Sequence, residues 1–459
     1  MANNVHYYAP ALERMSRDEI LGLQFKKLKY QLNYVYHHNP FYRRKFDEAQ
    51  LNPDGINSLK NFKRFPFTVK ADLLKDQEEN PPFGSRLGVP EEKIALIANT
   101  AGTSGLGIEL HAFTLRDLHS GVSACGFGFY WSGLRRGDVA VFSVAVSNHI
   151  LGRLLLEGVQ VLGRPSYLVG HLSFIDRLTH MKEFGVHGMW LTPSALNGLT
   201  TLCQQNDIDP REAFPDLKFI LLAGEPHPLT WAVKMENIWG AKVFENYGST
   251  QTGAWSSSTC ERGVAVNEQR GMQHFYEWSC LHEVIDPETG EGVAPGESGE
   301  LIVTPLEKEA SPLIRFRTGD RVTYLPYTYC GCGRQLDGIE VGTITRLDDM
   351  LKVKGTNLWP SQVDSVIFFH EEVDEYQGQV IIGAKGRDEI EITIALKEKY
   401  NDLPETARAE LVAKISAELK QKTELTMKVK EVERSLLPIW GTPERKARRW
   451  TDKRLKQMA

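Results

Sequence analysis

Residues 344–355, Ile-Thr-Arg-Leu-Asp-Asp-Met-Leu-Lys-Val-Lys-Gly, decide how the chain is divided. An Arg-x-Asp-Asp turn is followed here by a short apolar strand, a basic residue and a glycine, and this pattern fits an ordinary core element poorly. It is typical of a hinge that leads into a small, mobile C-terminal lobe. We therefore predict a large domain over residues 1–347 and a mobile lobe over residues 348–459.

The composition is that of a soluble globular protein with more than one folding unit. The chain has 459 residues, of which 41% are hydrophobic and 25% charged. Its net charge of −5 gives no electrostatic reason to expect nucleic acid or an anionic membrane as a partner. The first residues lack a basic-then-apolar signal pattern, and no apolar run reaches membrane-spanning length, so we expect a cytoplasmic protein.

The hydrophobic pattern predicts an α/β fold. Residues 11–50 have helical spacing, with a polar cap near Ser16 and Asp18 and an end at Pro40 and the basic segment 41–46. Between about residues 95 and 250, short apolar strands alternate with helical stretches, which favours βαβ units and a mainly parallel sheet. A β-rich subdomain is expected at about 255–345, and an α+β lobe with a charged helix over 404–424 completes the chain.

Several short segments combine glycines with polar residues at the ends of predicted elements. Residues 99–107, Asn-Thr-Ala-Gly-Thr-Ser-Gly-Leu-Gly, follow a predicted strand, and such a loop can bring backbone N–H and hydroxyl groups to a triphosphate. Each segment alone is also explained as an ordinary turn or a solvated charged loop. The others are 222–226 (Leu-Ala-Gly-Glu-Pro), 246–251 (Asn-Tyr-Gly-Ser-Thr-Gln), 315–320 (Arg-Phe-Arg-Thr-Gly-Asp) and 444–449 (Glu-Arg-Lys-Ala-Arg-Arg).

In order and spacing, these segments resemble the adenylate-forming ligases and, among them, the phenylacetate–CoA ligase family. The resemblance covers nearly the whole chain and includes residues 66–74, Pro-Phe-Thr-Val-Lys-Ala-Asp-Leu-Leu. It implies an AMP-forming ligase that joins an aromatic carboxylate to coenzyme A through an acyl-adenylate, with ATP, Mg²⁺ and CoA. Phenylacetate, indoleacetate, an aminobenzoate and a naphthoate are all compatible acids, and the family suggests a homodimer.

Two other functions remain open at this point. The same motifs serve adenylating enzymes that transfer the acyl group to an amine or a carrier protein. A nucleotide-binding protein without catalytic activity is the second alternative, because two motif positions depart from the family. Leu106 stands where a lysine is usual, and Gln251 stands where a carboxylate holds Mg²⁺. An amide oxygen is neutral and therefore a weaker ligand for a hard cation.

The resemblance assigns a nucleotide site. Asp320 would accept hydrogen bonds from both ribose hydroxyls, Tyr247 would pack against adenine, and the Thr250 hydroxyl would meet the α-phosphate. The remaining nucleotide-binding positions are Thr100, Gly102, Thr103, Ser104, Gly224, Glu225, Pro226, Asn246, Gly248, Gln251 and Arg346.

The resemblance also predicts how the lobe works. Asp348 would be the pivot of the hinge, and Lys446 would reach the substrate carboxylate and the α-phosphate during adenylation. Gly355 would line the path of CoA, where a side chain would obstruct the passage. Without the resemblance, the basic segment around Lys446 would be interpreted as a solvated tail.

Residues 330–334, Cys-Gly-Cys-Gly-Arg, resemble the Cys-Pro-Cys-Gly-Arg element of the phenylacetate branch. Two cysteines separated by one residue need two more ligands for tetrahedral zinc. The expected structural zinc site therefore consists of Cys330 and Cys332 with Cys260 and His274, while Cys280 and His282 are alternative ligands and free thiols the alternative state. A site of three cysteines and one histidine leaves no position for a catalytic water.

The acid-binding pocket has the weakest signal. The resemblance places an aromatic cluster there, which would form a flat slot for an aryl ring. Packing of these rings in the core is an equally good interpretation. The candidate pocket residues are Phe127, Tyr130, Trp131, His149 and Pro193.

Overall fold

The chain divides into two compact units in the computed structural model, which describes residues 7–100, 108–144, 146–147, 149–354, 356–383, 387–438 and 449–454. The larger unit comprises Met1–Gly224 and Ala232–Ile344, and the smaller one Glu225–Trp231 and Thr345–Ala459. No helix among the described residues is both long enough and apolar enough to cross a membrane.

The large unit begins with helices whose caps are legible in the sequence. Ser16 caps α2 (Arg17–His38), because its side chain accepts from the Glu19 N–H while the Glu19 carboxylate accepts from the Ser16 N–H. The helical prediction for this region is confirmed, but Pro40 does not only end a helix. It occupies the first turn of α3 (Pro40–Glu48), where a missing N–H costs nothing, and the basic segment 41–46 is therefore helical. The short α1 (Pro10–Glu13) precedes them.

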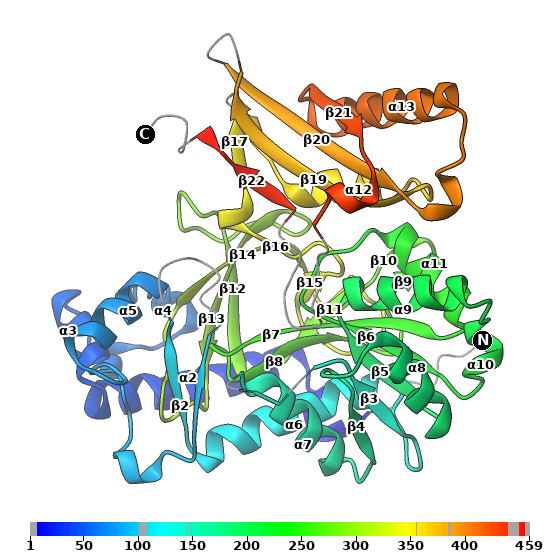
Figure 1. The fold of residues 1–459 in the computed structure, drawn as a ribbon. Coiled ribbons are helices and arrows are strands. Elements are labelled where there is room, and N and C mark those ends of the chain that lie inside the picture. Colours follow the sequence, from blue (N-terminus) through cyan, green and yellow to red (C-terminus); the bar gives the residue numbers. More distant parts are fainter. Residues whose placement is uncertain are drawn as a thin grey trace. The chain divides into compact units, whose positions relative to one another are not determined.

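A large mixed sheet organises the rest of this unit (Figure 1). Its strands β3 to β7 are parallel in the order β4-β3-β5-β6-β7, which confirms the expected α/β arrangement. From β7 onward the pairing is antiparallel, through β8, β11, β15, β14, β13 and β12. The bounds are Ala140–Phe142 (β3), Ser166–Leu168 (β4), Gly188–Leu191 (β5), Phe219–Leu222 (β6), Lys242–Ser249 (β7), Ala254–Thr259 (β8), Met272–Phe275 (β11), Cys280–Ile285 (β12), Ser298–Pro305 (β13), Phe316–Leu325 (β14) and Gly338–Glu340 (β15).

One predicted parallel strand is instead part of a hairpin. β1 (Leu96–Asn99) pairs antiparallel with β2 (Leu110–Phe113), outside the large sheet. The connection between them, residues 100–109, is shorter than the dozen or so residues that a parallel crossover requires. The hairpin therefore brings Thr100 and Glu109 together, and the Thr100 N–H donates to the Glu109 carbonyl at 3.0 Å. A second small hairpin joins β9 (Ala265–Val266) and β10 (Gln269–Arg270).

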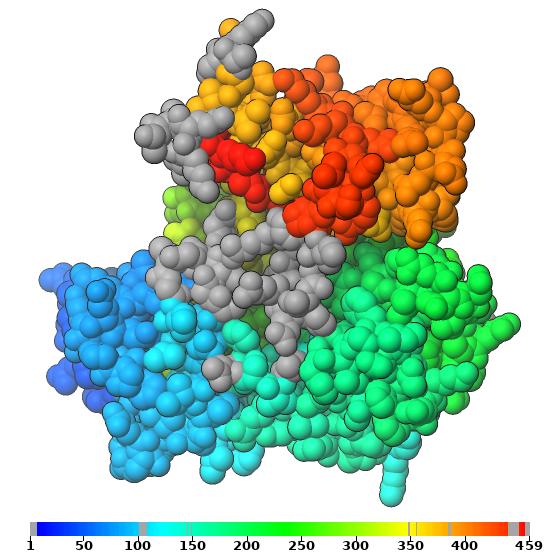
Figure 2. Space-filling model, in the orientation of Figure 1, coloured from blue at the N-terminus to red at the C-terminus, as the bar shows by residue number. Residues whose placement is uncertain are grey.

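Helices cover the sheet and flank it. α6 (Leu115–Trp131) packs on α7 (Ile150–Val161) and on β8 (Figure 1). Its apolar residues, among them Phe127, Phe129 and Trp131, belong to the main core. In the space-filling view, the blue residues of the N-terminal part and the green residues from about 170 to 240 lie on opposite sides of the visible face of this unit (Figure 2). The other helices are α4 (Leu59–Phe62), α5 (Lys70–Glu79), α8 (Phe174–Glu183), α9 (Pro193–Gln205), α10 (Pro210–Ala213) and α11 (Leu229–Trp239).

The smaller unit is α+β, as predicted. Its sheet has the order β21-β20-β19-β22, and α12 packs on α13, which confirms the expected helix over 404–424. Tyr376, Ile392 and Ile415 are fully buried in its core. The bounds are β16 (Thr345–Arg346), β17 (Leu351–Val353), β18 (Thr356–Leu358), α12 (Pro360–Ile367), β19 (Val373–Ile382), β20 (Asp388–Leu396), α13 (Glu405–Thr423), β21 (Met427–Glu431) and β22 (Trp450–Asp452).

Candidate nucleotide and metal sites

Two parallel strands deliver predicted nucleotide-binding residues to one edge of the sheet. The parallel pairing of β6 with β7 ends at Leu222 and Glu245, so Gly224 and Asn246 both lie just beyond the last parallel pair, at the edge where ligands bind in open α/β sheets. Gly224 has a φ of 85°, which glycine adopts without strain. The Asn246 side-chain oxygen accepts from Trp190 Nε1 at 3.0 Å and is held in place. Glu225 and Pro226 follow Gly224 directly and cluster with the smaller unit.

Tyr247 and Asp320, the residues expected at adenine and ribose, contact each other. The Tyr247 hydroxyl donates to Asp320 Oδ2 at 2.6 Å, although the residues lie on β7 and β14. The Asp320 N–H donates to the Thr318 hydroxyl, which fixes the backbone before the carboxylate. Both side chains are half-buried. The structure therefore brings an aromatic ring and a carboxylate into one partly accessible position.

A tight hairpin between β7 and β8 presents Thr250 and Gln251. Gly248 is required there, because a Cβ at this position would lie 2.4 Å from the Ala254 carbonyl oxygen. The turn is closed by side chains, since the Ser249 N–H donates to the Thr252 hydroxyl at 3.0 Å. Thr250 and Gln251 are half-buried at its tip.

Gln251 is held from two sides. Its side-chain Nε2 donates to Glu109 Oε2 at 3.0 Å, and its backbone oxygen accepts from Lys308 Nζ at 3.1 Å. Glu109 directly precedes β2 and His111 lies on it; both side chains are fully buried, with Glu109 Oε1 2.7 Å from His111 Nε2. That contact is short but its direction is not that of a hydrogen bond, so we treat it as an electrostatic contact. Arg86, also fully buried, donates to the Leu110 carbonyl beside it.

Burial and mutual attraction set the charges of this cluster. Burial opposes ionisation of Glu109, but His111, Arg86 and the Gln251 amide outweigh that effect and hold its pKa below the usual range. Burial lowers the pKa of His111 to about 4, against the attraction of Glu109. Burial also lowers the pKa of Lys308 to about 8. At neutral pH the cluster therefore contains an anionic Glu109 and a neutral His111.

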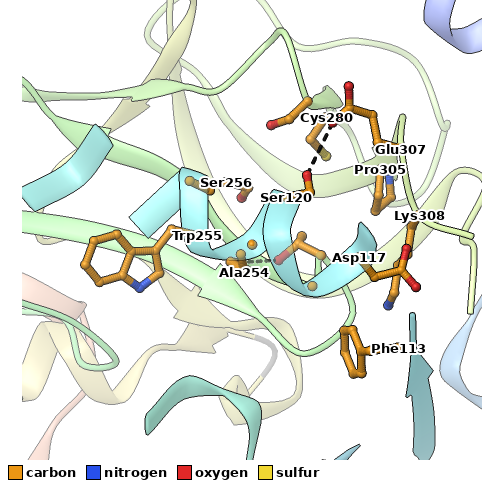
Figure 3. Close-up of a pocket in the computed structure, with 15 residues that line it drawn as sticks. Phe113, Asp117, Ser120, Ala254, Trp255, Ser256, Cys280, Pro305, Glu307 and Lys308 are labelled. Carbon is orange, nitrogen blue, oxygen red and sulfur yellow. Dashed lines mark hydrogen bonds between the residues drawn. The ribbon is translucent and has the colours of Figure 1, made fainter. Parts of the chain in front are cut away.

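A small cavity of about 30 Å³ adjoins Lys308 (Figure 3). In this view Lys308 points toward the Phe113 ring, whose centroid is 4.9 Å from Nζ, and the Ser120 hydroxyl donates to Glu307 at 3.3 Å. Asp117 accepts from the Glu309 and Ala310 N–H groups, which fixes the loop that carries Lys308. A volume of this size suits water and is far below that of an aryl-acid pocket.

The aromatic residues proposed for the acid pocket occupy different environments. Phe127 and Trp131 are buried, and they pack against Trp278 and Tyr276 with ring centroids 4.7 and 5.5 Å apart. Their environment is the core that was the alternative interpretation. Tyr130 is half-buried beneath Arg135, whose guanidinium carbon lies 4.0 Å from the ring centroid.

The other two pocket candidates lie at the ends of elements. His149 is exposed, and its Nδ1 lies 3.0 Å from the Asn99 carbonyl, next to Thr100. Pro193 is buried in the first turn of α9, behind the Thr192 cap. Among the residues that the structure describes, no single pocket is lined by all five candidates.

Some predicted positions are not placed. Gly102, Thr103, Ser104, Gly355 and Lys446, together with Leu106, lie outside the described residues. Arg346 is half-buried at the end of β16, and Asp348 lies in the 3-10 turn Leu347–Asp349 between β16 and β17.

Four side chains from distant segments converge as the sequence suggested for a metal. The ligand atoms of Cys260, His274, Cys330 and Cys332 all lie within 4.8 Å of one another, and all four residues are buried. The Cys260 and Cys330 sulfurs are 3.6 Å apart, and Cys332 Sγ is 3.5 Å from His274 Nε2. His274 Nδ1 lies 3.3 Å from the Leu336 carbonyl, so Nε2 is the ring atom that faces the sulfurs.

The alternative ligands are positioned elsewhere. Cys280 contacts the Leu281 carbonyl, and the His282 ring stacks on Phe275 with centroids 4.0 Å apart. Hydrogen bonds from Cys260 and Cys330, with the His274 charge, lower the pKa of Cys332. One thiolate is therefore already favoured in this cluster, as metal binding requires.

Sequence reasoning missed the polar residues that support both sites. Arg334 donates to Glu13 at 3.0 Å and to Glu261 at 2.9 Å, and its guanidinium carbon lies 4.6 Å from the Trp131 ring centroid. Beside Gln251 it missed Glu109, His111, Arg86 and Lys308. In the segment 108–113 the polar residues alternate with apolar ones, which is typical of a strand with one solvated face. The glycine loop directly before it was the available sign that this face is buried at a site.

The mixed sheet with its edge motifs, the Tyr247–Asp320 pair and the α+β unit define an adenylate-forming, AMP-binding enzyme. Residues 50–305 match the model of the family described as AMP-binding enzyme, and residues 355–454 match that of the AMP-binding enzyme C-terminal domain. The chain belongs to the phenylacetate–CoA ligase family of these enzymes, and it is an acid–thiol ligase.

Its relatives are similar over most of their length. The phenylacetate-coenzyme A ligase of Thermus thermophilus is 32% identical over 396 residues, which are 86% of this chain and 85% of the relative. That of Escherichia coli is 28% identical over 89% of this chain and 90% of the relative. A solved 2-hydroxyisobutyryl-CoA ligase, in complex with an acyl-adenylate, has a TM-score of 0.87 at 24% identity and covers 100% of this chain and 96% of its own. That last likeness establishes the fold.

Proposed function

We propose that this acyl-CoA ligase acts on an aromatic carboxylic acid of the phenylacetate type, or on a larger aryl acid. The observation that carries the proposal is the similarity to phenylacetate-coenzyme A ligases across 86% of the chain. In the first step a carboxylate oxygen bonds to the α-phosphorus of ATP, and the bond to pyrophosphate breaks. In the second step the CoA sulfur bonds to the acyl carbon, the carbon–oxygen bond breaks, and AMP leaves.

The nucleotide site supports the first step. Asp320 can accept both ribose hydroxyls, and its hydrogen bond from Tyr247 fixes the tyrosine ring at a set distance from the carboxylate. Thr250, at the tip of the β7–β8 turn, is the hydroxyl assigned to the α-phosphate. The step needs orientation and charge stabilisation far more than proton transfer. We assign the added positive charge to Lys446.

Mg²⁺ enters this reaction with ATP, and when bound it neutralises charge on the phosphates. The groups around Gln251 show whether the chain can bind this ion. Its amide and the buried Glu109 carboxylate provide oxygen atoms, the donor type that a hard cation prefers. Gln251 would hold the ion and Glu109 would support it.

The second step is assigned to the smaller unit. We infer that it turns about Asp348, withdraws Lys446 and opens the path of CoA past Gly355. The isolated 3-10 turn Leu347–Asp349 between two very short strands supports a pivot, because few backbone hydrogen bonds must break for its dihedral angles to change.

We also propose a structural zinc ion at Cys260, His274, Cys330 and Cys332. The donor set fits, because three sulfurs and one imidazole nitrogen within 4.8 Å of one another match a closed tetrahedral site. When bound, zinc would cross-link β11, the residue after β8 and the loop before β15.

The substrate class is tested by measuring AMP and pyrophosphate release with MgATP across a panel of aryl and alkyl acids, with and without CoA. CoA-dependent release with one or more aryl acids supports the proposal. Exclusive turnover of alkyl acids would overturn the aryl assignment. Acid-dependent pyrophosphate exchange without CoA-dependent turnover would instead favour transfer to an amine or a carrier protein.

A further inference from the structure

The most unusual pair in the molecule is Gln251 and Glu109. Gln251 stands where related enzymes are expected to have a metal-binding carboxylate, and a fully buried carboxylate lies one hydrogen bond away. Glu109 directly precedes β2, is far from Gln251 in the sequence, and no motif of the chain predicts it. Lys308 contacts the Gln251 backbone, and both Lys308 and Arg86 attract the Glu109 carboxylate, so its negative charge is compensated.

The chemistry of the pair fixes the orientation of the Gln251 side-chain amide. A carboxylate accepts hydrogen bonds and cannot donate them, so the Gln251 nitrogen must face Glu109 at 3.0 Å. The amide oxygen is then the end turned away from Glu109, and Gln251 is only half-buried. A hydrogen bond to an anion also polarises the amide and makes its oxygen a better ligand for a cation.

The pair also explains why position 251 is not acidic here. A glutamate at 251 would place two carboxylates at hydrogen-bond distance in a mostly buried site, where they cannot both ionise without a large penalty. With glutamine at 251 and glutamate at 109, one negative charge remains and one hydrogen bond is formed. Exchanging the two residues would preserve both.

We propose that Glu109 is a positioning residue for MgATP, and that it supplies through the Gln251 amide the negative charge that a single carboxylate provides in related enzymes. This inference rests on the proposed function, because it concerns the same phosphate-binding site. Glu109 acts through Gln251 and need not touch the metal. A purely structural Glu109 would only neutralise Arg86 and Lys308.

Four variants separate these roles: Glu109→Gln, Gln251→Glu, the double exchange, and Glu309→Gln. The last is a matched control, because it removes a carboxylate next to Lys308 that pairs with Arg116 and does not face Gln251. Calorimetry would measure ATP affinity with and without Mg²⁺, and AMP affinity without metal. The ratio of the two ATP affinities reports the metal contribution and does not depend on turnover.

We expect each single exchange to reduce this ratio about tenfold, since a charge-assisted hydrogen bond is lost or a repulsion is added. The double exchange should bring the ratio of ATP affinities back to within about threefold of wild type. The AMP affinity of all variants should stay at the wild-type value. The ratio measured for Glu309→Gln should also equal that of the wild type. A double exchange as weak as Glu109→Gln would overturn the proposal. So would single exchanges with a wild-type ratio.

Glu109→Gln removes a buried charge and could prevent folding, so Gln251→Leu provides an independent test. Gln251 is half-buried, so leucine can be accommodated there. This change leaves Glu109 ionised, but the leucine side chain cannot connect Glu109 to the metal. A folded Gln251→Leu protein whose metal contribution equals that of the wild type would also overturn the proposal. Failure of the proposed function looks different, because wild-type protein would then release no AMP with any acid, whatever the variants bind.

Discussion

Asp320 allows the proposed nucleotide site to be tested at a single side chain. Its carboxylate accepts from Tyr247 at 2.6 Å and retains acceptor capacity for the ribose hydroxyls. Asp320→Asn should therefore weaken ATP binding by one to two powers of ten, because hydrogen bonds to a charged acceptor contribute about 1.5–3 kcal/mol each. Calorimetry with ATP and 2′-deoxy-ATP checks the assignment.

The analogue provides the control within the same experiment. Wild-type protein should bind 2′-deoxy-ATP more weakly than ATP. Asp320→Asn should bind the two nucleotides with nearly the same affinity. Equal losses for both proteins would show that Asp320 does not contact that hydroxyl. Tyr247→Phe keeps the ring and removes only its hydrogen bond, so it should cost less than Asp320→Asn.

Single residues also mark where sequence reasoning stops. Asp320, Tyr247 and the cysteines were proposed as site residues because each belongs to a motif with fixed spacing, and the structure shows that Tyr247 contacts Asp320 and that three cysteines cluster with His274. Glu109 and Arg86 were not, because their role arises only when the β1–β2 hairpin lies beside the β7–β8 turn. A charged residue that is buried with its partner has the same local pattern as one that is solvated.

At the scale of elements, the cysteine–histidine cluster should hold together strands of the antiparallel part of the sheet. We expect Cys332→Ser to abolish bound zinc and to lower the free energy of unfolding by about 4 kcal/mol, as loss of a metal site does. Metal analysis and urea unfolding measure the two effects. Cys203→Ser is the matched control, since Cys203 is fully buried on α9 and distant from the four ligands in sequence.

The control should lose stability and keep its zinc. Purified wild-type protein without zinc, or a Cys332→Ser protein with full zinc content, would contradict the proposed site.

β12 contributes a pH dependence through His282. Burial lowers the pKa of His282 to about 3, and a hydrogen bond with the Cys280 backbone opposes that shift only in part. The unfolded chain therefore binds a proton at this residue below about pH 6.5, while the folded protein does not, so stability falls as the pH falls. Between pH 6.5 and 4.5 this group should account for about 2 kcal/mol of the loss.

Urea unfolding at both pH values, for wild type and His282→Phe, isolates this contribution. The phenyl ring can keep the stack on Phe275 without titrating. The variant should lose about 2 kcal/mol less than wild type over this interval. Parallel losses in the two proteins would show that His282 does not titrate as burial implies.

Elements differ in how far the sequence predicts them. The capping box at Ser16 and the charged helix α13 were clear from local pattern. Pro40 and the strand β1 were misassigned, because a proline begins a helix as readily as it ends one, and an apolar strand pattern does not name its partner. The strand with which β1 pairs depended on the length of the connection that follows β1.

For the whole molecule, the central expectation is that two half-reactions use different arrangements of one chain. Lys446→Ala should reduce adenylation by about two to three powers of ten, since the charge that develops at the α-phosphate loses its stabilisation. Thioester formation from supplied aryl-adenylate and CoA should stay within about threefold of wild type. Single-turnover assays of each half-reaction measure both rates.

Lys453→Ala is the control for this experiment, because Lys453 is an exposed basic residue of the same terminal segment. It should leave both rates unchanged. Equal losses of the two half-reactions in Lys446→Ala would contradict the assignment of Lys446 to adenylation alone.

The route of the carboxylate oxygen tests the account most directly. The enzyme would be supplied with MgATP, CoA and an aryl acid that it turns over, labelled with ¹⁸O at both carboxylate oxygens, and the products weighed by mass spectrometry. Because the carboxylate attacks the α-phosphorus, we predict one ¹⁸O atom in AMP and the other in the thioester. Unlabelled AMP, or label in inorganic phosphate released with ADP, would contradict an acyl-adenylate intermediate.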